Sequence, residues 1–152
     1  MKEKIQTIRL SSMDLSLFKK LITLLNEVFE EYNTIASDAH LQKLIARPEF
    51  YAVVAISNDL IIGGLTAYEL QNYYTDKSEL YLYDIAVRSK FQNKGVGKQL
   101  IQHLKELSSK NNISTIFVDA HSEDKQAVTF YESVFGVSEK VDHFNIEIKP
   151  SS

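Results

Sequence analysis

The 152-residue sequence contains no cysteine, only two prolines and only five glycines. Without cysteine the chain has no disulfide, no thiolate metal site and no cysteine nucleophile. It has no apolar run near the roughly 20 residues that a membrane-spanning helix needs, and the N-terminus, Met-Lys-Glu-Lys-Ile, lacks the apolar stretch of a secretory signal. These absences predict a cytoplasmic protein with no membrane partner.

The remaining composition is that of a globular protein. Hydrophobic residues make up 44% of the chain and charged residues 24%, which are ordinary values for a packed domain. The length predicts a single domain over residues 1–152. A net charge of −3 argues against nucleic acid as a partner and is compatible with a small cationic substrate.

Hydrophobic periodicity predicts the element order β-α-α-β-β-β-α-β-α-β. The expected elements include strands over 51–56, 60–70, 78–87, 114–120 and 141–148, and helices over 96–110 and 125–134. This order predicts an α+β fold whose mixed central sheet combines an antiparallel meander with parallel crossover strands, flanked by about four helices.

The stretch from Tyr83 to Gly97 combines an apolar strand, a short polar loop and the start of an amphipathic helix. Such a loop directs backbone N–H groups to one place and adds the positive end of the helix dipole, which makes an anion site suited to a phosphate. Two familiar phosphate loops are excluded. Gln99 stands where a Walker A loop needs Ser or Thr, and Leu100 stands where the dinucleotide fingerprint needs glycine.

The pattern Gln-x-x-Gly-x-Gly over 92–97 resembles the acetyl-CoA pyrophosphate loop of the GNAT superfamily of N-acetyltransferases. The segment 124–131, Asp-x-x-Ala-x-x-Phe-Tyr, is similar to the helix that flanks the cofactor in that superfamily. A closer resemblance, over about residues 50–148, is to its aminoglycoside 3-N-acetyltransferases, through four pieces of sequence. They are Gly-Gly-Leu-Thr-Ala-Tyr at 63–68, the strand at 78–87, the phosphate loop with its helix, and His-Phe-Asn-Ile at 143–146.

The resemblance implies a GNAT fold and transfer of an acetyl group from acetyl-CoA to a primary amine of a small cationic acceptor. The acceptor it implies is an aminoglycoside antibiotic acetylated at the 3-N position, as in antibiotic resistance. Because the chain has no cysteine for an acetyl-enzyme, direct attack in a ternary complex is the simpler mechanism. The alternatives are an acetyltransferase for a polyamine or a protein N-terminus, and a non-catalytic acyl-CoA-binding module.

The resemblance also implies which residues bind the cofactor. Backbone groups of the strand end would meet the pantetheine arm and the thioester oxygen, loop donors would hold the pyrophosphate, and one acidic residue would border the cofactor. These residues are Ile85, Ala86, Val87, Gln92, Asn93, Lys94, Gly95, Val96, Gly97, Lys98 and Asp124. No metal is expected, since the histidines lack the spacing of ligands on one helix.

Asp84 is the first candidate for the group that meets the substrate amine, as base or as ammonium anchor. A carboxylate in an otherwise apolar strand needs a reason because unpaired buried charge is costly; capping a neighbouring element or pairing with a basic side chain is the structural alternative. Glu79 is the second candidate base. Strict alternation along the strand places Glu79 on the sheet face opposite that of Asp84. A β-bulge between them would bring both carboxylates to one face, and action of Glu79 through a bridging water is equally open. In the resembled family, the tyrosine at Tyr131 protonates the leaving thiolate; alternatively, Tyr131 is a core aromatic.

The predicted acceptor site contains Asp84, His121, Glu123 and His143. His121 stands where the resembled family has a carboxylate. This departure concerns which acceptor is bound and leaves the implied cofactor binding unaffected. A homodimer is expected from an exposed last strand at a sheet edge.

Overall fold

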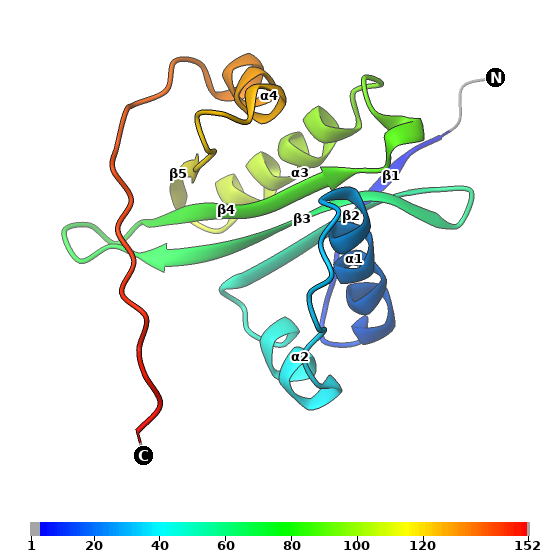
Figure 1. Ribbon diagram of the computed structural model, residues 1–152, viewed down its shortest axis with the longest axis horizontal. Helices are drawn as coiled ribbons and strands as arrows, with labels where there is room; N and C mark the ends of the chain where they lie inside the picture. The colour runs from blue at the N-terminus through cyan, green and yellow to red at the C-terminus, as the bar shows by residue number, and fades with distance from the viewer. Residues whose placement is uncertain (1–3, 152) are drawn as a thin grey trace. The chain divides into compact units, whose positions relative to one another are not determined.

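Five strands form one sheet in the order β1-β2-β3-β4-β5, antiparallel except for the parallel pair of β4 and β5 (Figure 1). The strands are β1 (Gln6–Arg9), β2 (Phe50–Ser57), β3 (Leu60–Gln71), β4 (Ser78–Val87) and β5 (Ile113–Val118). Helix α3 (Val96–Lys110) makes the crossover between the two parallel strands. The predicted meander followed by a parallel crossover strand is therefore confirmed.

The structure is a computed structural model that describes residues 4–151. Its contacts divide the chain into two units, the first ending at Asp119 and the second beginning at Ala120. The first unit holds the whole sheet, and the second holds α4 (Lys125–Phe135). A single domain over 1–152 stays a prediction.

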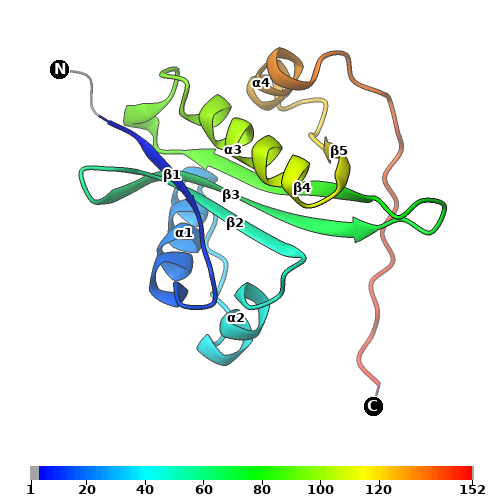
Figure 2. The ribbon, with the colours of Figure 1, turned by 180° about the vertical axis from the view of Figure 1, so that it is seen from behind.

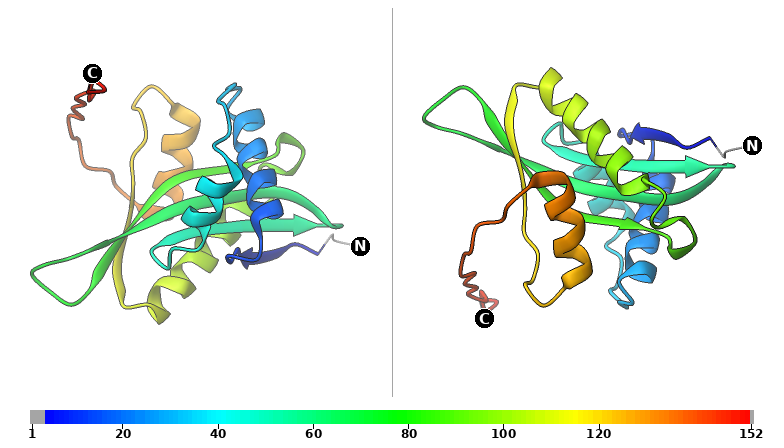
Figure 3. Two further views of the ribbon diagram at one scale, coloured as in Figure 1. Left: turned by 90° about the horizontal axis from the view of Figure 1, so that it is seen from below. Right: turned by 90° about the horizontal axis from the view of Figure 1, so that it is seen from above.

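Helices cover both faces of the sheet in the first unit. Helices α1 (Leu15–Val28) and α2 (Asp38–Ile45) lie on one face and α3 lies on the other (Figures 2 and 3). A short 3-10 turn, Ser89–Phe91, precedes α3. Within residues 4–151, no helix has the length and apolar character needed to cross a bilayer.

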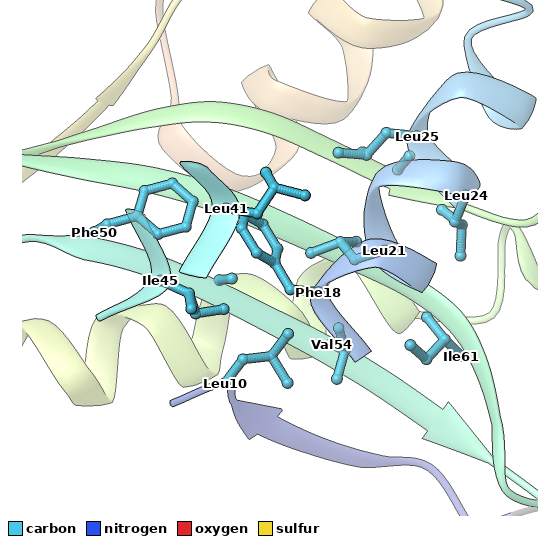
Figure 4. Close-up of a cluster of buried hydrophobic side chains, with 12 residues drawn as sticks. Leu10, Phe18, Leu21, Leu24, Leu25, Leu41, Ile45, Phe50, Val54 and Ile61 are labelled. Atoms are coloured by element: carbon cyan, nitrogen blue, oxygen red, sulfur yellow. The ribbon is translucent and has the colours of Figure 1, made fainter. Parts of the chain in front are cut away.

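The main apolar core lies between α1, α2 and the sheet (Figure 4). Phe18, Leu21 and Leu24 of α1 are fully buried there. Gly64 of β3 permits this packing, because a Cβ at Gly64 would collide with Leu21 and lie 2.9 Å from the Val53 carbonyl oxygen. The close approach fixes α1 against β3 and β4, the strands that hold the candidate site.

The strand predicted over 141–148 is wrong, since the described residues after Gly136 form neither helix nor strand. Apolar side chains do alternate there, and Phe144, Ile146 and Ile148 are each 87% exposed. Alternation indicates a strand only when a neighbouring strand completes the hydrogen-bond ladder, and the described chain gives this segment none. The predicted homodimer loses the edge strand on which it depended and stays a prediction.

Candidate active site

A β-bulge in β4 determines where the candidate base points. Asp84 lies opposite Thr66 of β3, but Leu82 lies opposite the next residue, Ala67. Tyr83 is therefore an extra residue in the ladder, and it reverses the alternation of β4 at that point. Glu79 lies opposite Leu70, so it shares a sheet face with Asp84. The two candidate carboxylates lie on one face, as the bulge hypothesis required.

Asp84 is half-buried, and its surroundings raise its pKa from 3.8 to about 6. Burial is the larger cause, because it disfavours the charged carboxylate. The second cause is the negative charge of Glu31, in the loop between α1 and α2. A carboxyl with this pKa is ionised at neutral pH and still basic enough to receive a proton from an amine.

Glu31 was missed by the sequence reasoning, because the resemblance begins after it. Its loop is held in place by asparagines: the Asn26 side chain donates to the Asn33 carbonyl at 3.0 Å, and the Asn33 amide donates to Glu31 Oε2 at 2.6 Å. Glu31 therefore has an oriented carboxylate. The sequence signal available for this loop was the position of Asn26 and Asn33 on either side of Glu30 and Glu31.

Tyrosine rings lie beside Asp84 on the same face. The Tyr83 ring lies 5.6 Å from that of Tyr68 and 5.8 Å from that of Tyr81, both edge to face. Burial is the largest cause that raises the pKa of both Tyr68 and Tyr81. The hydrogen bond to Asp119 is the second cause for Tyr81, and the charge of Asp84 adds a smaller effect on both phenols. Both phenols are therefore neutral hydrogen-bond donors at physiological pH.

Beyond the bulge, β4 pairs with β3 alone. The parallel ladder between β4 and β5 ends at Leu82 and Val118. Residues 85–87 continue to pair with β3, through Leu65, Gly64 and Gly63. In the described ladders, the backbone edge of 85–87 turned away from β3 has no strand partner. An extended ligand with amide groups fits such an edge.

The predicted phosphate loop leads directly into the N-terminus of α3. Gly95 has φ +83°, in the left-handed region, and α3 begins at Val96 with no side-chain cap on its first N–H groups. Gly95 therefore has a conformational reason to be glycine, because a residue without a Cβ adopts a positive φ at little cost. Uncapped N–H groups at the positive end of a helix suit a phosphate.

Two other residues of this loop already have intramolecular partners. The Gln92 side chain donates to the Val87 carbonyl at 2.8 Å and ties the loop to the end of β4. The Lys94 ammonium lies 5.6 Å from the centre of the Phe91 ring. The Gln92 side chain therefore ties the loop to β4, and its role in cofactor binding stays a prediction.

The second unit contains the other predicted site residues. Asp124 caps α4, since its side chain accepts from the Ala127 N–H at 3.1 Å. The Tyr131 ring packs at 6.0 Å from that of Phe135, and a ring nitrogen of His143 lies 3.0 Å from Asn145 Oδ1. His121 and Glu123 are exposed. The roles of these residues in a site with Asp84 stay predictions.

Residues 18–137 match a family model described as the acetyltransferase (GNAT) family. The chain is 28% identical over 72 residues to the [ribosomal protein bS18]-alanine N-acetyltransferase of Escherichia coli K12. That match covers 47% of each protein, so the chain spans about half the length of this curated relative.

Two solved structures from uncultured soil metagenomic samples are similar over nearly their whole length. One is the aminoglycoside acetyltransferase meta-AAC0020 in complex with sisomicin, at 37% identity and a TM-score of 0.92, covering 95% of this chain and 97% of that one. The other is the aminoglycoside acetyltransferase HMB0005, at 32% identity and a TM-score of 0.91, covering 96% of this chain and 99% of that one.

Proposed function

This chain belongs to the acetyltransferase (GNAT) family, and from that premise we propose that it transfers an acetyl group from acetyl-CoA to a primary amine of a small cationic acceptor. The acceptor we propose is an aminoglycoside, acetylated at its 3-N position. The single observation that supports this most is Asp84, a half-buried carboxylate with a pKa of about 6 on the sheet face beside an unpaired strand edge. The similarity to meta-AAC0020 and HMB0005, both aminoglycoside acetyltransferases, supports an aminoglycoside as the class of acceptor.

The reaction we propose is a direct transfer within a ternary complex. Asp84, with Glu79 or a bridging water as the alternative, takes a proton from the ammonium group of the acceptor. The free amine then attacks the thioester carbonyl, so that a C–N bond forms and the C–S bond breaks. The Tyr131 hydroxyl supplies the proton that the leaving thiolate takes up, and the proton that the attacking nitrogen loses as the amide forms restores the Tyr131 phenol.

Two parts of the cofactor would have different partners in the first unit. The backbone of 85–87 would bind the pantetheine arm and the thioester oxygen. The N–H groups of 93–98 would hold the pyrophosphate, where α3 begins without a side-chain cap. These donors are fixed before binding by the Gln92 contact to Val87, and pre-organised donors bind more strongly because little order remains to be imposed.

Release of coenzyme A should be measured with a panel of aminoglycosides, spermidine and peptides with a free N-terminal alanine. Turnover of an aminoglycoside, with the acetylated nitrogen located by NMR, would establish the proposal. The partial match to the alanine N-acetyltransferase favours a peptide amine as the second candidate. Turnover of peptides alone would support that candidate, and no turnover of any amine would support the non-catalytic module.

A further inference from the structure

Four aromatic side chains form a continuous row across three strands on the face that bears Asp84. We call Tyr68 of β3, Tyr83 and Tyr81 of β4 and Phe117 of β5 the aromatic strip. Tyr83 contacts both other tyrosines edge to face, and Tyr81 stacks on Phe117 with ring centres 4.8 Å apart and planes 5° apart. Tyr83 is 57% exposed, so the middle of the strip is accessible to a ligand.

A second carboxylate lies on the strip, at the strand neighbouring that of Asp84. The Tyr81 hydroxyl donates to Asp119 Oδ2 at 3.0 Å. Asp119 follows β5 directly and shares the face of Phe117, two residues earlier. The parallel register sets Val118 opposite Leu82. One residue further along the two strands come Asp119 of the β5 segment and Tyr83 of β4. Asp84, the next residue along β4, and Asp119, at the end of β5, therefore both lie near Tyr83.

This arrangement has a defined chemical preference. An exposed phenol ring binds the hydrocarbon face of another ring and attracts cations through its negative π face. Asp119 has one lone-pair direction occupied by Tyr81 and keeps its remaining acceptor sites for another donor. Asp119 was not among the residues that the sequence predicted, and its partner Tyr81 becomes apparent only from the register of β4 with β5.

We propose that Asp119 and the aromatic strip form the outer part of the acceptor site, where Asp119 binds a second ammonium group and Tyr83 packs against the ring that bears it. The inference rests on the proposed function and assigns the residues that recognise a second amine of its ring-bearing acceptor. Asp84 receives the reacting amine, and Asp119 sets the choice of acceptor without taking part in the chemistry.

The test compares two ligands that share a ring and differ in one amine, 1,3-diaminocyclohexane and cyclohexylamine. NMR titrations with coenzyme A present give both affinities for the wild type and for Asp119→Asn. The wild type should bind the diamine roughly tenfold more tightly, and the variant should lose that difference while its affinity for the monoamine is unchanged. Equal affinities of the wild type for both ligands, or an unchanged difference in Asp119→Asn, would overturn the inference.

Variants of the aromatic strip test the second half of the proposal. Tyr83→Phe keeps the ring and should bind the diamine within about twofold of the wild type, whereas Tyr83→Leu should bind it roughly fivefold more weakly. Glu106→Gln, an exposed acid on α3, is the matched control for lost negative charge and should change neither affinity. Equal binding by Tyr83→Leu and Tyr83→Phe would remove the ring from the site.

The binding experiment separates this inference from the proposed function. If no amine releases coenzyme A but the diamine preference still depends on Asp119, the acceptor site stands and the transfer reaction does not. If aminoglycosides are acetylated and Asp119→Asn leaves the preference intact, the reaction stands and the outer site does not. If Asp119→Asn shows no thermal unfolding transition, the variant is unfolded, and a salt titration of the wild type then tests the outer site. Added salt must weaken the diamine more than the monoamine, because two charge pairs are screened instead of one.

Discussion

Asp84 on β4 and Glu31 in the loop after α1 are coupled electrostatically, although they are far apart in the sequence. Burial is the first cause of the raised pKa of Asp84, and the charge of Glu31 is the second. The coupling makes the basicity of the proposed base depend on a loop outside the sheet. It also makes that basicity adjustable by a substitution that leaves Asp84 in place.

The first prediction is the pH dependence of the reaction. Asp84 must be ionised to receive a proton, so kcat/KM should fall as the pH drops through about 6. Glu31→Gln removes a negative charge that raises the pKa of Asp84, and the acid limb should therefore move to lower pH. Rates measured from pH 4.5 to 8.5 check both statements, with Glu106→Gln as the control. An acid limb that stays in place in Glu31→Gln would disprove the coupling.

A second prediction concerns the free energy of unfolding. The pKa of Asp84 is higher in the folded protein, about 6, than the ordinary 3.8. The folded state therefore binds more protons between these values, and the contribution of Asp84 to stability falls as the pH rises through this window. Asp84→Asn should be more stable than the wild type at pH 8, by about 1 kcal/mol after solvent screening is allowed for, or roughly 2–4 °C in Tm.

Thermal melts at pH 8 and pH 3.5 measure that difference. The advantage of Asp84→Asn should disappear at the lower pH, where the wild-type carboxyl is protonated. Its turnover should be low at either pH, because the amide accepts no proton. A variant less stable than the wild type at pH 8 would favour a structural role for Asp84, such as pairing with a basic side chain.

The sequence predicts most of the fold because its local signals agree with the tertiary contacts. Alternation in 60–70 and 78–87 and the helical spacing after Gly97 predict β3, β4 and α3, and all three are present. The segment 141–148 shows the same alternation, yet it is no strand, because pairing depends on a neighbour that a local pattern does not contain.

The sequence predicts those residues of the candidate site that lie in one continuous segment, and it misses those that reach the site from another segment through tertiary packing. Asp84 stands out as a charge in an apolar strand, and its neighbours 85–87 follow from the phosphate loop. Glu31 and Asp119 lie near it only through the packing of α1 and the register of β5. The sequence leaves a β-bulge between Glu79 and Asp84 open without giving its position, and only the observed register, with its extra residue at Tyr83, decides the face of Glu79.

A third prediction tests the loop before α3. Gly95 has φ +83° and, apart from its chain neighbours, no atom of the described residues lies within 4 Å of where a Cβ would stand, so substitution there changes backbone strain and leaves the packing unaffected. Gly95→Val should lose roughly 1–2 kcal/mol of stability and most of its affinity for acetyl-CoA. Gly95→Asn, which tolerates the left-handed region, should keep the stability.

Calorimetry with acetyl-CoA and thermal melts of both variants separate the two effects. The loss of affinity in Gly95→Asn reports the space that the ligand needs near the backbone, because its strain is small. Full affinity in both Gly95→Val and Gly95→Asn would show that the pyrophosphate does not bind at the start of α3.

The last prediction concerns the proton for the leaving thiolate. Tyr131→Phe keeps the ring contact with Phe135 and removes only the hydroxyl, so acetyl-CoA affinity should hold. Turnover should fall roughly 10²-fold, as is typical when a general acid is lost. Phe130→Leu, at the neighbouring aromatic of α4, is the matched control for packing and should lower Tm more than turnover. If Tyr131→Phe instead loses stability in step with activity, Tyr131 is a packing residue and the thiolate takes its proton from elsewhere.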